Sequence, residues 1–89
     1  MPALPGIYQF KDKTDKIIYI GKAKNLKNRI GSYFFSSDFK VIELLKVATD
    51  IEFITTNNEI EALFLEAQLI KQHQPPFNRL LKAGNPYNY

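Results

Sequence analysis

Two short apolar runs near the N-terminus have the composition of β-strands. Residues 7–10 and 17–20 are rich in isoleucine, tyrosine and phenylalanine, and polar and apolar positions alternate, though imperfectly, in the first run. The stretch between them, residues 11–16, is polar and contains the aspartates and the threonine that are typical of turns. These runs predict a β-hairpin whose second strand ends at Gly21. The apolar positions within residues 51–54 predict a third strand.

The middle of the chain has the spacing of two amphipathic helices. Leu26 and Ile30 are four residues apart and an aromatic pair follows at helical spacing, which predicts a first helix over residues 23–34. Residues 36–38 are Ser-Ser-Asp and offer capping side chains. The apolar positions within residues 41–47 then predict a second helix.

The longest helix is predicted over residues 59–73. Asn57 and Asn58 provide an N-terminal cap, glutamates occupy the first turn, and the proline pair at residues 75–76 ends the helix. The remaining tail, residues 77–89, is basic, aromatic and rich in turn-forming residues. We therefore expect no regular helix in the tail.

Length and element order define the expected fold class. A chain of 89 residues is expected to form a single domain over residues 1–89, and its 45% hydrophobic and 24% charged residues are typical of a folded protein. The order β-β-α-α-β-α predicts an α+β fold in which helices cover a small antiparallel or mixed sheet. The apolar runs are far shorter than the roughly 20 residues of a membrane span, so we expect a soluble, cytoplasmic protein with no membrane contact.

The composition removes several kinds of chemistry. The chain has no cysteine and one histidine, His73, which excludes disulfides, thiol nucleophiles, cysteine-ligated zinc and His-paired metal sites. His73 stands at the end of the longest predicted helix, where a helix-terminal cation or a solvent-exposed ring is the common arrangement. Any reaction must therefore use carboxylates, tyrosine, lysine, arginine and asparagine.

Positive charge is concentrated in the N-terminal third of the chain. Residues 1–34 contain seven basic and two acidic residues, a net charge of +5, whereas residues 35–89 contain five basic and seven acidic residues, a net charge of −2. This asymmetry favours a polyanion bound to the N-terminal part. From charge alone, an ordinary solvated lysine face is an equal alternative.

Two cations and a phenol fall in one stripe of the first predicted helix if that helix begins near Lys22. Lys22 and Arg29 are seven residues apart and Tyr33 is four further on, so the three side chains project in nearly the same direction. A planar arginine fork and a lysine point charge suit a phosphodiester. The competing interpretation is ordinary lysine and arginine side chains that lie along the surface.

Glu66 is a carboxylate within an apolar stretch. In residues 62–70 only Glu66 and Gln68 are polar. A carboxylate in such surroundings is paired with a cation, protonated or bound to a metal. Two roles stay open: a structural ion pair with Arg29 or Lys22, and a ligand for a hard cation such as Mg²⁺.

Tyr8 and Tyr19 lie on the two strands of the predicted hairpin, each close to a glycine. Cross-strand aromatic packing is the commoner role of such tyrosines. As a functional pair they can provide a phenolate general base. A free tyrosine has a pKa of about 10, however, so a cation such as Lys22 would have to lower the pKa of the phenol.

Several separated motifs, in one order, resemble the GIY-YIG nuclease family. The chain has Gly-Ile-Tyr at residues 6–8 and Tyr-Ile-Gly at residues 19–21, followed by basic and aromatic residues, a glutamate in a late helix and then an asparagine. Residues 19–30 and 65–71 resemble the N-terminal domain of the UvrC branch of this family. Residues 74–78 are also similar to its short homologue Cho and to GIY-YIG domains joined to a polymerase exonuclease subunit.

That resemblance implies a three-stranded antiparallel sheet flanked by about three helices, and a metal-dependent endonuclease that nicks one DNA strand. It implies a single Mg²⁺ or Mn²⁺ ion on Glu66, and Arg29 beside the charged phosphate. It also implies Tyr19, or in other members of the family Tyr8, as the general base. Lys22, Tyr33 and Asn78 match further active-site positions. The residues expected to bind DNA are Lys22, Lys24, Lys27 and Arg29.

For the UvrC branch, the resemblance implies the 3′ incision of nucleotide excision repair on duplex DNA. UvrB is then the expected partner, and the chain is expected to be a monomeric domain in the N-terminal part of a longer repair protein. Two other classes stay open: a non-catalytic module that binds nucleic acid or a partner through the same basic face, and a purely structural ion-pair network. Chelation of divalent ions would stop a nuclease but leave a phosphate-binding module attached to DNA.

Overall fold

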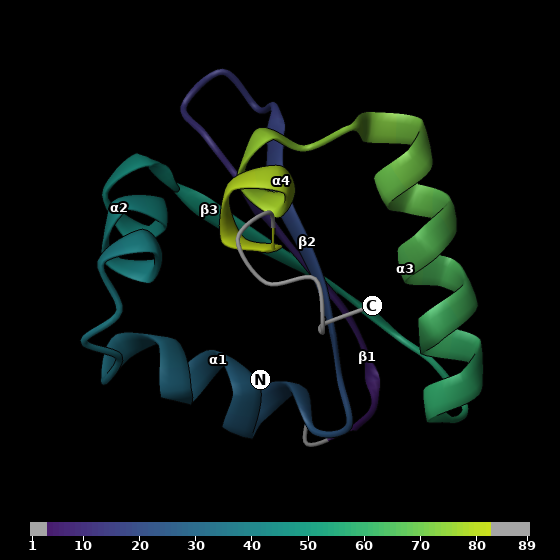
Figure 1. Ribbon diagram of the computed structural model, residues 1–89. Coiled ribbons are helices and arrows are strands. Elements are labelled where there is room, and N and C mark those ends of the chain that lie inside the picture. The colour runs from purple at the N-terminus through teal and green to yellow at the C-terminus, as the bar shows by residue number, and fades with distance from the viewer. Residues whose placement is uncertain (1–3, 83–89) are drawn as a thin grey trace.

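A computed structural model describes residues 4–82 and shows a three-stranded sheet with helices packed on both faces (Figure 1). The strands are β1 (Gly6–Lys11), β2 (Ile17–Ala23) and β3 (Asp50–Thr55). Their order across the sheet is β2-β1-β3, and both pairings are antiparallel. The α+β prediction is confirmed, and of the two sheet types left open the antiparallel one is formed.

The hairpin turn is shaped by one aspartate. Asp12 Oδ1 accepts hydrogen bonds from the backbone N–H and the hydroxyl of Thr14, at 2.9 and 2.6 Å, and from the backbone N–H of Lys16 at 3.1 Å. Asp15 has a φ of 68°, a left-handed conformation that aspartate tolerates better than most residues. The predicted turn is confirmed, although the first strand extends to Lys11.

The register of the hairpin decides which side chains share a face. Tyr8 lies opposite Gly21, and Phe10 lies opposite Tyr19. Residues directly opposed in an antiparallel pair point to the same side of a sheet, while their neighbours along each strand point to the other side. All four residues therefore belong to one face.

This face is covered by α1 (Leu26–Phe34) and α2 (Phe39–Val47). We call the buried cluster beneath them the aromatic core, because four of its members carry aromatic rings. Its buried members include Tyr8, Phe10, Tyr19, Leu26, Ile30, Tyr33 and Leu44.

The opposite face is covered by α3 (Glu59–His73). We call this second cluster the aliphatic core. Its buried members are Ile7, Ile20 and Ala62, and Ile17, Leu65, Leu69 and Ile70 pack against them. No helix within residues 4–82 is long and apolar enough to cross a membrane.

The first helix begins later than the sequence predicted. β2 continues through Ala23, which pairs with Gly6, and the side chain of Asn25 then caps α1 by accepting a hydrogen bond from the N–H of Asn28. The prediction of a helix over residues 23–34 is therefore wrong at its N-terminal end. Lys22 is a strand residue, so it does not share a helical stripe with Arg29 and Tyr33.

A fourth helix, α4 (Pro76–Lys82), lies against β2 between α2 and α3 (Figure 1). The prediction that the tail, residues 77–89, has no regular helix is wrong for residues 77–82. Gln74 takes a left-handed conformation that ends α3, and Pro76 occupies the first position of α4, where a missing N–H leaves no hydrogen bond unmade. Residues 83–89 of the predicted tail lie outside the described residues.

Candidate active site

Tyr8 and Tyr33 share a hydrogen bond within the aromatic core. Their hydroxyl oxygens are 2.6 Å apart, and their rings meet edge to face with centroids separated by 5.7 Å. Arg29 Nε donates a hydrogen bond to the hydroxyl of Tyr8 at 3.4 Å. Because Arg29 and Tyr33 are four residues apart on α1, both side chains reach the same hydroxyl from one side of the helix.

Gly21 makes room for Tyr8. A Cβ atom at position 21 would lie 2.3 Å from both Cζ and the hydroxyl oxygen of Tyr8, which is closer than any real contact. The φ of Gly21 is not positive, so the glycine is required here by space and not by its backbone conformation. The glycine of the Tyr-Ile-Gly motif therefore positions the tyrosine of the Gly-Ile-Tyr motif.

Tyr19 is buried beside this pair, 6% exposed, with its ring centroid 6.2 Å from that of Tyr8. Burial raises the pKa of Tyr19 above its ordinary range, and the charges of Tyr8 and Glu66 raise it further. A hydrogen bond to Tyr33 and the guanidinium of Arg29 act in the opposite direction. Burial also raises the pKa of Tyr33, so both phenols are protonated at neutral pH.

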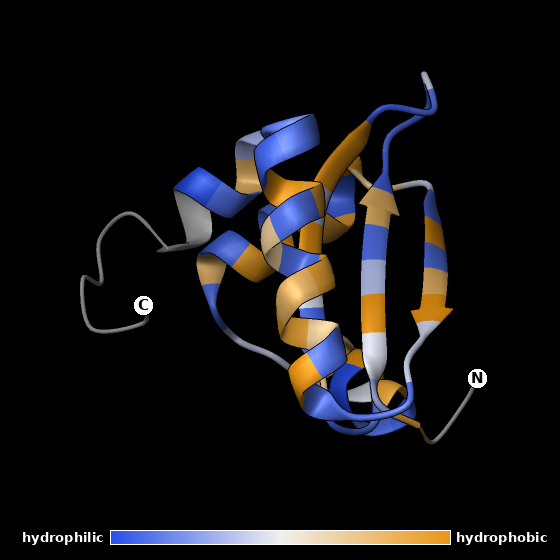
Figure 2. Ribbon diagram, turned by 90° about the vertical axis from the view of Figure 1, so that its right-hand side faces the viewer, coloured by the Kyte–Doolittle hydropathy of each residue, from blue (hydrophilic) through white to orange (hydrophobic). Residues whose placement is uncertain are grey.

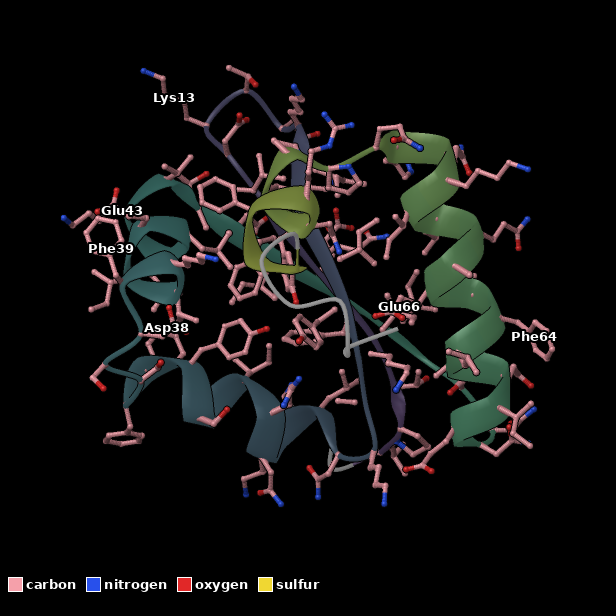
Figure 3. The ribbon with its side chains drawn as sticks, in the orientation of Figure 1. Lys13, Asp38, Phe39, Glu43, Phe64 and Glu66 are labelled. Atoms are coloured by element: carbon pink, nitrogen blue, oxygen red, sulfur yellow. The ribbon has the colours of Figure 1, made fainter. Side chains whose placement is uncertain are left out.

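Glu66 projects from α3 toward the centre of the molecule (Figure 3) and is only 9% exposed. Its charge is one of the causes that raise the pKa of Tyr19. Residues 4–82 contain no group of three or more histidine, cysteine, aspartate or glutamate side chains that could hold a metal. Mg²⁺ nevertheless fits a site with one carboxylate ligand from the protein, because it commonly binds through one or two carboxylates and keeps water and substrate phosphate as its other ligands.

Asn78 supports the free edge of the sheet. Its Oδ1 accepts a hydrogen bond from the backbone N–H of Ile20, and its Nδ2 donates one to the carbonyl of Ile20, both at 2.7 Å. The amide thus pairs with β2 as a neighbouring strand would. The structure places Asn78 against the backbone next to Tyr19, where it holds the strand in position.

A hollow of about 500 Å³ opens at the solvent side of Arg29, and we call it the basic hollow. Its lining residues are Lys22, Ala23, Lys24, Asn25, Asn28, Arg29 and Ser32. Lys22 comes from β2 and Arg29 from α1, so strand and helix bring the two cations together without the helical stripe that the sequence suggested. Arg29 also donates a hydrogen bond to Tyr8, so one guanidinium links the wall of the basic hollow to the buried hydroxyl of Tyr8.

The structure does not gather every predicted residue. Lys27 is exposed on α1 but does not line the basic hollow, and His73 is exposed in the last turn of α3, as expected for a helix-terminal or solvent-facing group. The sequence interpretation missed Asn28 and Ser32, which line the hollow beside Arg29. Ser32 is three residues after Arg29 and four after Asn28, so it is a neighbour of both on the helix surface, and that spacing was the available signal.

Comparison with known proteins gives consistent matches over the described part of the chain. The model of the UvrC-like GIY-YIG domain matches residues 4–79. The UvrABC system protein C of Synechococcus sp. (strain JA-2-3B'a(2-13)) is 50% identical over 92 residues, and that of Lacticaseibacillus casei (strain BL23) is 52% identical over 90 residues. Each match covers 100% of this chain and 15% of the relative, so the chain spans about 15% of the length of these curated relatives.

A solved structure shares the fold. The GIY-YIG N-terminal endonuclease domain of UvrC from Thermotoga maritima, bound to its catalytic magnesium, superposes with a TM-score of 0.81. The two sequences are 46% identical, and the match covers 85% of this chain and 84% of that one.

Proposed function

We propose that this chain, which belongs to the UvrC-like GIY-YIG domain family, is a DNA endonuclease that hydrolyses a phosphodiester bond and so nicks one strand. One observation carries the proposal. Arg29 lines the basic hollow, which a phosphate can enter, and its Nε also contacts the hydroxyl of Tyr8 in the aromatic core. A single guanidinium thus joins a cationic surface to the phenols, and the charge of Glu66 acts on one of them, Tyr19.

Hydrolysis needs charge stabilisation and proton transfer from these side chains. The oxygen of a water molecule bonds to phosphorus, the bond from phosphorus to one sugar oxygen breaks, a base takes a proton from the water, and the departing oxygen gains a proton. Arg29 and Lys22 offset the negative charge that develops on the phosphate oxygens. The phenolate form of Tyr19 or Tyr8 accepts the proton from water, and the phenol that results returns a proton to the departing oxygen.

A phenol accepts a proton only after it has lost its own, so the charges around Tyr19 matter. Burial and the carboxylate of Glu66 raise its pKa, while Arg29 opposes them. We assign Glu66 as the residue that would hold a single Mg²⁺ or Mn²⁺ ion, an assignment supported by the burial of its carboxylate, its direction toward the centre of the molecule (Figure 3) and the effect of its charge on Tyr19. When bound, such an ion supplies positive charge to the phosphate and acidifies water.

We extend this proposal to the 3′ incision of nucleotide excision repair, because the relatives are UvrABC system protein C. The chain then acts on duplex DNA in the cytoplasm, as a monomeric domain in the N-terminal part of a longer repair protein with UvrB as its partner. We assign the choice of incision position to the other parts of that longer protein.

Nicking of supercoiled plasmid DNA tests the proposal. The wild-type chain should convert supercoiled plasmid to open circles in Mg²⁺ or Mn²⁺, and EDTA should stop the conversion. Arg29→Ala should slow nicking by about 100-fold to 1,000-fold, because a charge-stabilising group is lost. Lys13→Ala is the matched control, since it removes one cation from the hairpin turn, away from the basic hollow (Figure 3). A wild-type chain that binds DNA but does not nick it with either ion would instead be a non-catalytic binding module.

A further inference from the structure

A second hollow shares a wall with the basic hollow. It has a volume of about 300 Å³, and we call it the apolar hollow. Its lining residues are Lys22, Ala23, Lys24, Glu59, Ile60, Ala62 and Leu63. Residues 22–24 line both hollows, so the end of β2 and the loop that follows it separate one from the other.

The apolar hollow combines aliphatic surface with charge. Ile60 is 67% exposed and Leu63 is 48% exposed, whereas Ala62 is buried. Ile60 and Leu63 are three residues apart on α3 and therefore neighbours on its surface. Lys24 Nζ and Glu59 Oε1 face each other from opposite sides, 3.7 Å apart. Aliphatic side chains thus remain in contact with water directly beside the cations of the basic hollow.

We propose that the apolar hollow receives an unstacked nucleobase of the DNA strand whose phosphate enters the basic hollow, an inference that rests on the proposed function. A nucleobase has apolar faces and polar edges, which matches aliphatic walls with charged groups around them. Ile60 and Leu63 contact its face, as aliphatic side chains do when they enter a distorted duplex. Lys22 and Lys24, on the shared wall, pair with the phosphates of the same strand.

Glu59 adds a hydrogen-bond acceptor to this arrangement. A carboxylate accepts hydrogen bonds from the exocyclic amino groups of cytosine, adenine and guanine, and thymine has no such group. The hollow is therefore suited to a base that carries an amino group. Lys24, which pairs with Glu59 in the free protein, can exchange this partner for a phosphate.

A nucleobase fits the charge of the hollow better than an apolar protein segment does. Two lysines line the wall, and they favour a polyanion. A protein partner lying along α3 would also cover Phe64, which is 70% exposed and points away from the hollow (Figure 3). Figure 2, in which α3 faces the viewer, shows hydrophobic residues on this outer side of the helix. A base in the hollow contacts Ile60 and Leu63 but not Phe64.

DNA binding in EDTA, where no cutting occurs, separates these possibilities. Fluorescence anisotropy of a labelled duplex gives the affinity of the 89-residue chain, of the double variant Ile60→Gln/Leu63→Gln, and of the matched control Phe64→Gln. Glutamine is a good helix former, so α3 should be retained, which thermal melting checks. The double variant should bind about tenfold more weakly, with the salt dependence of binding unchanged because the phosphate contacts remain. Phe64→Gln should bind as the wild type does.

A fluorescent base locates the contact. In duplexes that carry 2-aminopurine at successive positions, the wild-type chain should raise the fluorescence at one position, and the double variant should abolish that rise. Equal affinity and equal fluorescence for wild type and double variant would overturn this inference alone. If Phe64→Gln lowers the affinity for DNA as much as the double variant does, the inference is overturned in favour of a contact along all of α3. A wild-type chain without affinity for DNA would overturn the proposed function as well.

Discussion

On one face of the sheet, β1 and β2 present Ile7 and Ile20 to α3, and on the other face the adjacent residues Tyr8 and Tyr19 enter the aromatic core. The aliphatic core is held by burial and close packing alone. The aromatic core is equally buried at Tyr8, yet it contains three hydroxyls and is reached by the guanidinium of Arg29. Strand alternation therefore places aliphatic residues of β1 and β2 on one face of the sheet and their phenols on the other, while Glu66 comes from α3, the helix that covers the aliphatic core.

Because the two cores differ in this way, loss of stability and loss of nicking should be separable by mutation. A change in the aliphatic core should lower the free energy of unfolding and leave nicking intact in the folded protein. A change in the aromatic core should reduce nicking even when the protein remains folded.

Ile7→Ala should lower the free energy of unfolding by about 2–5 kcal/mol, because Ile7 is fully buried and the change leaves a cavity. Urea unfolding measures this loss, and the nicking rate should stay at the wild-type value at a temperature where the variant is folded. If Ile7→Ala does not fold, Ile7→Val should still show a loss of about 0.5–1.5 kcal/mol with normal nicking. Slow nicking by a folded Ile7→Val protein would contradict the separation of the two faces.

Gly21→Ala should lower the free energy of unfolding by about 1–3 kcal/mol, because the new methyl group overlaps the Tyr8 ring. The displaced hydroxyl then loses its contacts with Arg29 and Tyr33, so nicking by the folded variant should also slow. Urea unfolding and plasmid nicking, measured on the same preparation, check both effects. Wild-type nicking by this variant would show that the position of Tyr8 does not matter for the reaction.

Asn78→Ala should lower the free energy of unfolding by about 1–3 kcal/mol, because the N–H and carbonyl of Ile20 both lose their partner. Amide hydrogen exchange should reveal a specific loss of protection at Ile20, at the free edge of β2. Asn78→Asp keeps an acceptor for the N–H but turns a carboxylate oxygen toward the carbonyl of Ile20 in a buried position, so its effect should be at least as large. Unchanged protection at Ile20 in Asn78→Ala would refute the edge-supporting role.

Gly31→Ala should raise the free energy of unfolding by about 0.4–1 kcal/mol. A Cβ atom at Gly31 meets nothing within 4 Å, and its φ is not positive, so the helix gains a better helix former without a clash. Glycine-to-alanine substitution should thus lower the free energy of unfolding at position 21 and raise it at position 31, a difference that paired thermal melts can measure. Destabilisation by Gly31→Ala would mean that the space around α1 is tighter than the structure shows.

Most of the secondary structure was predictable because apolar spacing is a local signal. The hairpin, the third strand and the helices that became α2 and α3 follow from it. The start of α1 was not predictable in this way, since Lys22 and Ala23 are acceptable helix formers and only pairing with β1 keeps them in a strand. α4 was missed for a similar reason: Asn78 anchors it to Ile20, which is 58 residues away in the chain.

The candidate site was predictable in its residue types but not in its geometry. The pairing shifts between Phe10 and Lys11, so counting outward from the turn does not give the register of the hairpin. A slip of one residue moves every side chain to the other face, and the fit of Tyr8 against Gly21 depends on that register. The spacing of Arg29 and Tyr33 on α1 was visible in the sequence, whereas their shared contact with Tyr8 required the tertiary structure.

The nicking rate of Glu66→Gln in Mg²⁺ tests whether the Glu66 carboxylate takes part in the reaction, with Glu43→Gln as the matched control. Both variants replace one carboxylate by an amide. Glu43 lies on α2 and pairs with Lys46, away from the candidate site (Figure 3). With both variants folded, as judged by thermal melting, Glu66→Gln should nick supercoiled DNA at least about 100-fold more slowly than the wild type, and Glu43→Gln at the wild-type rate. Wild-type nicking by Glu66→Gln would contradict the assignment of this carboxylate to the reaction.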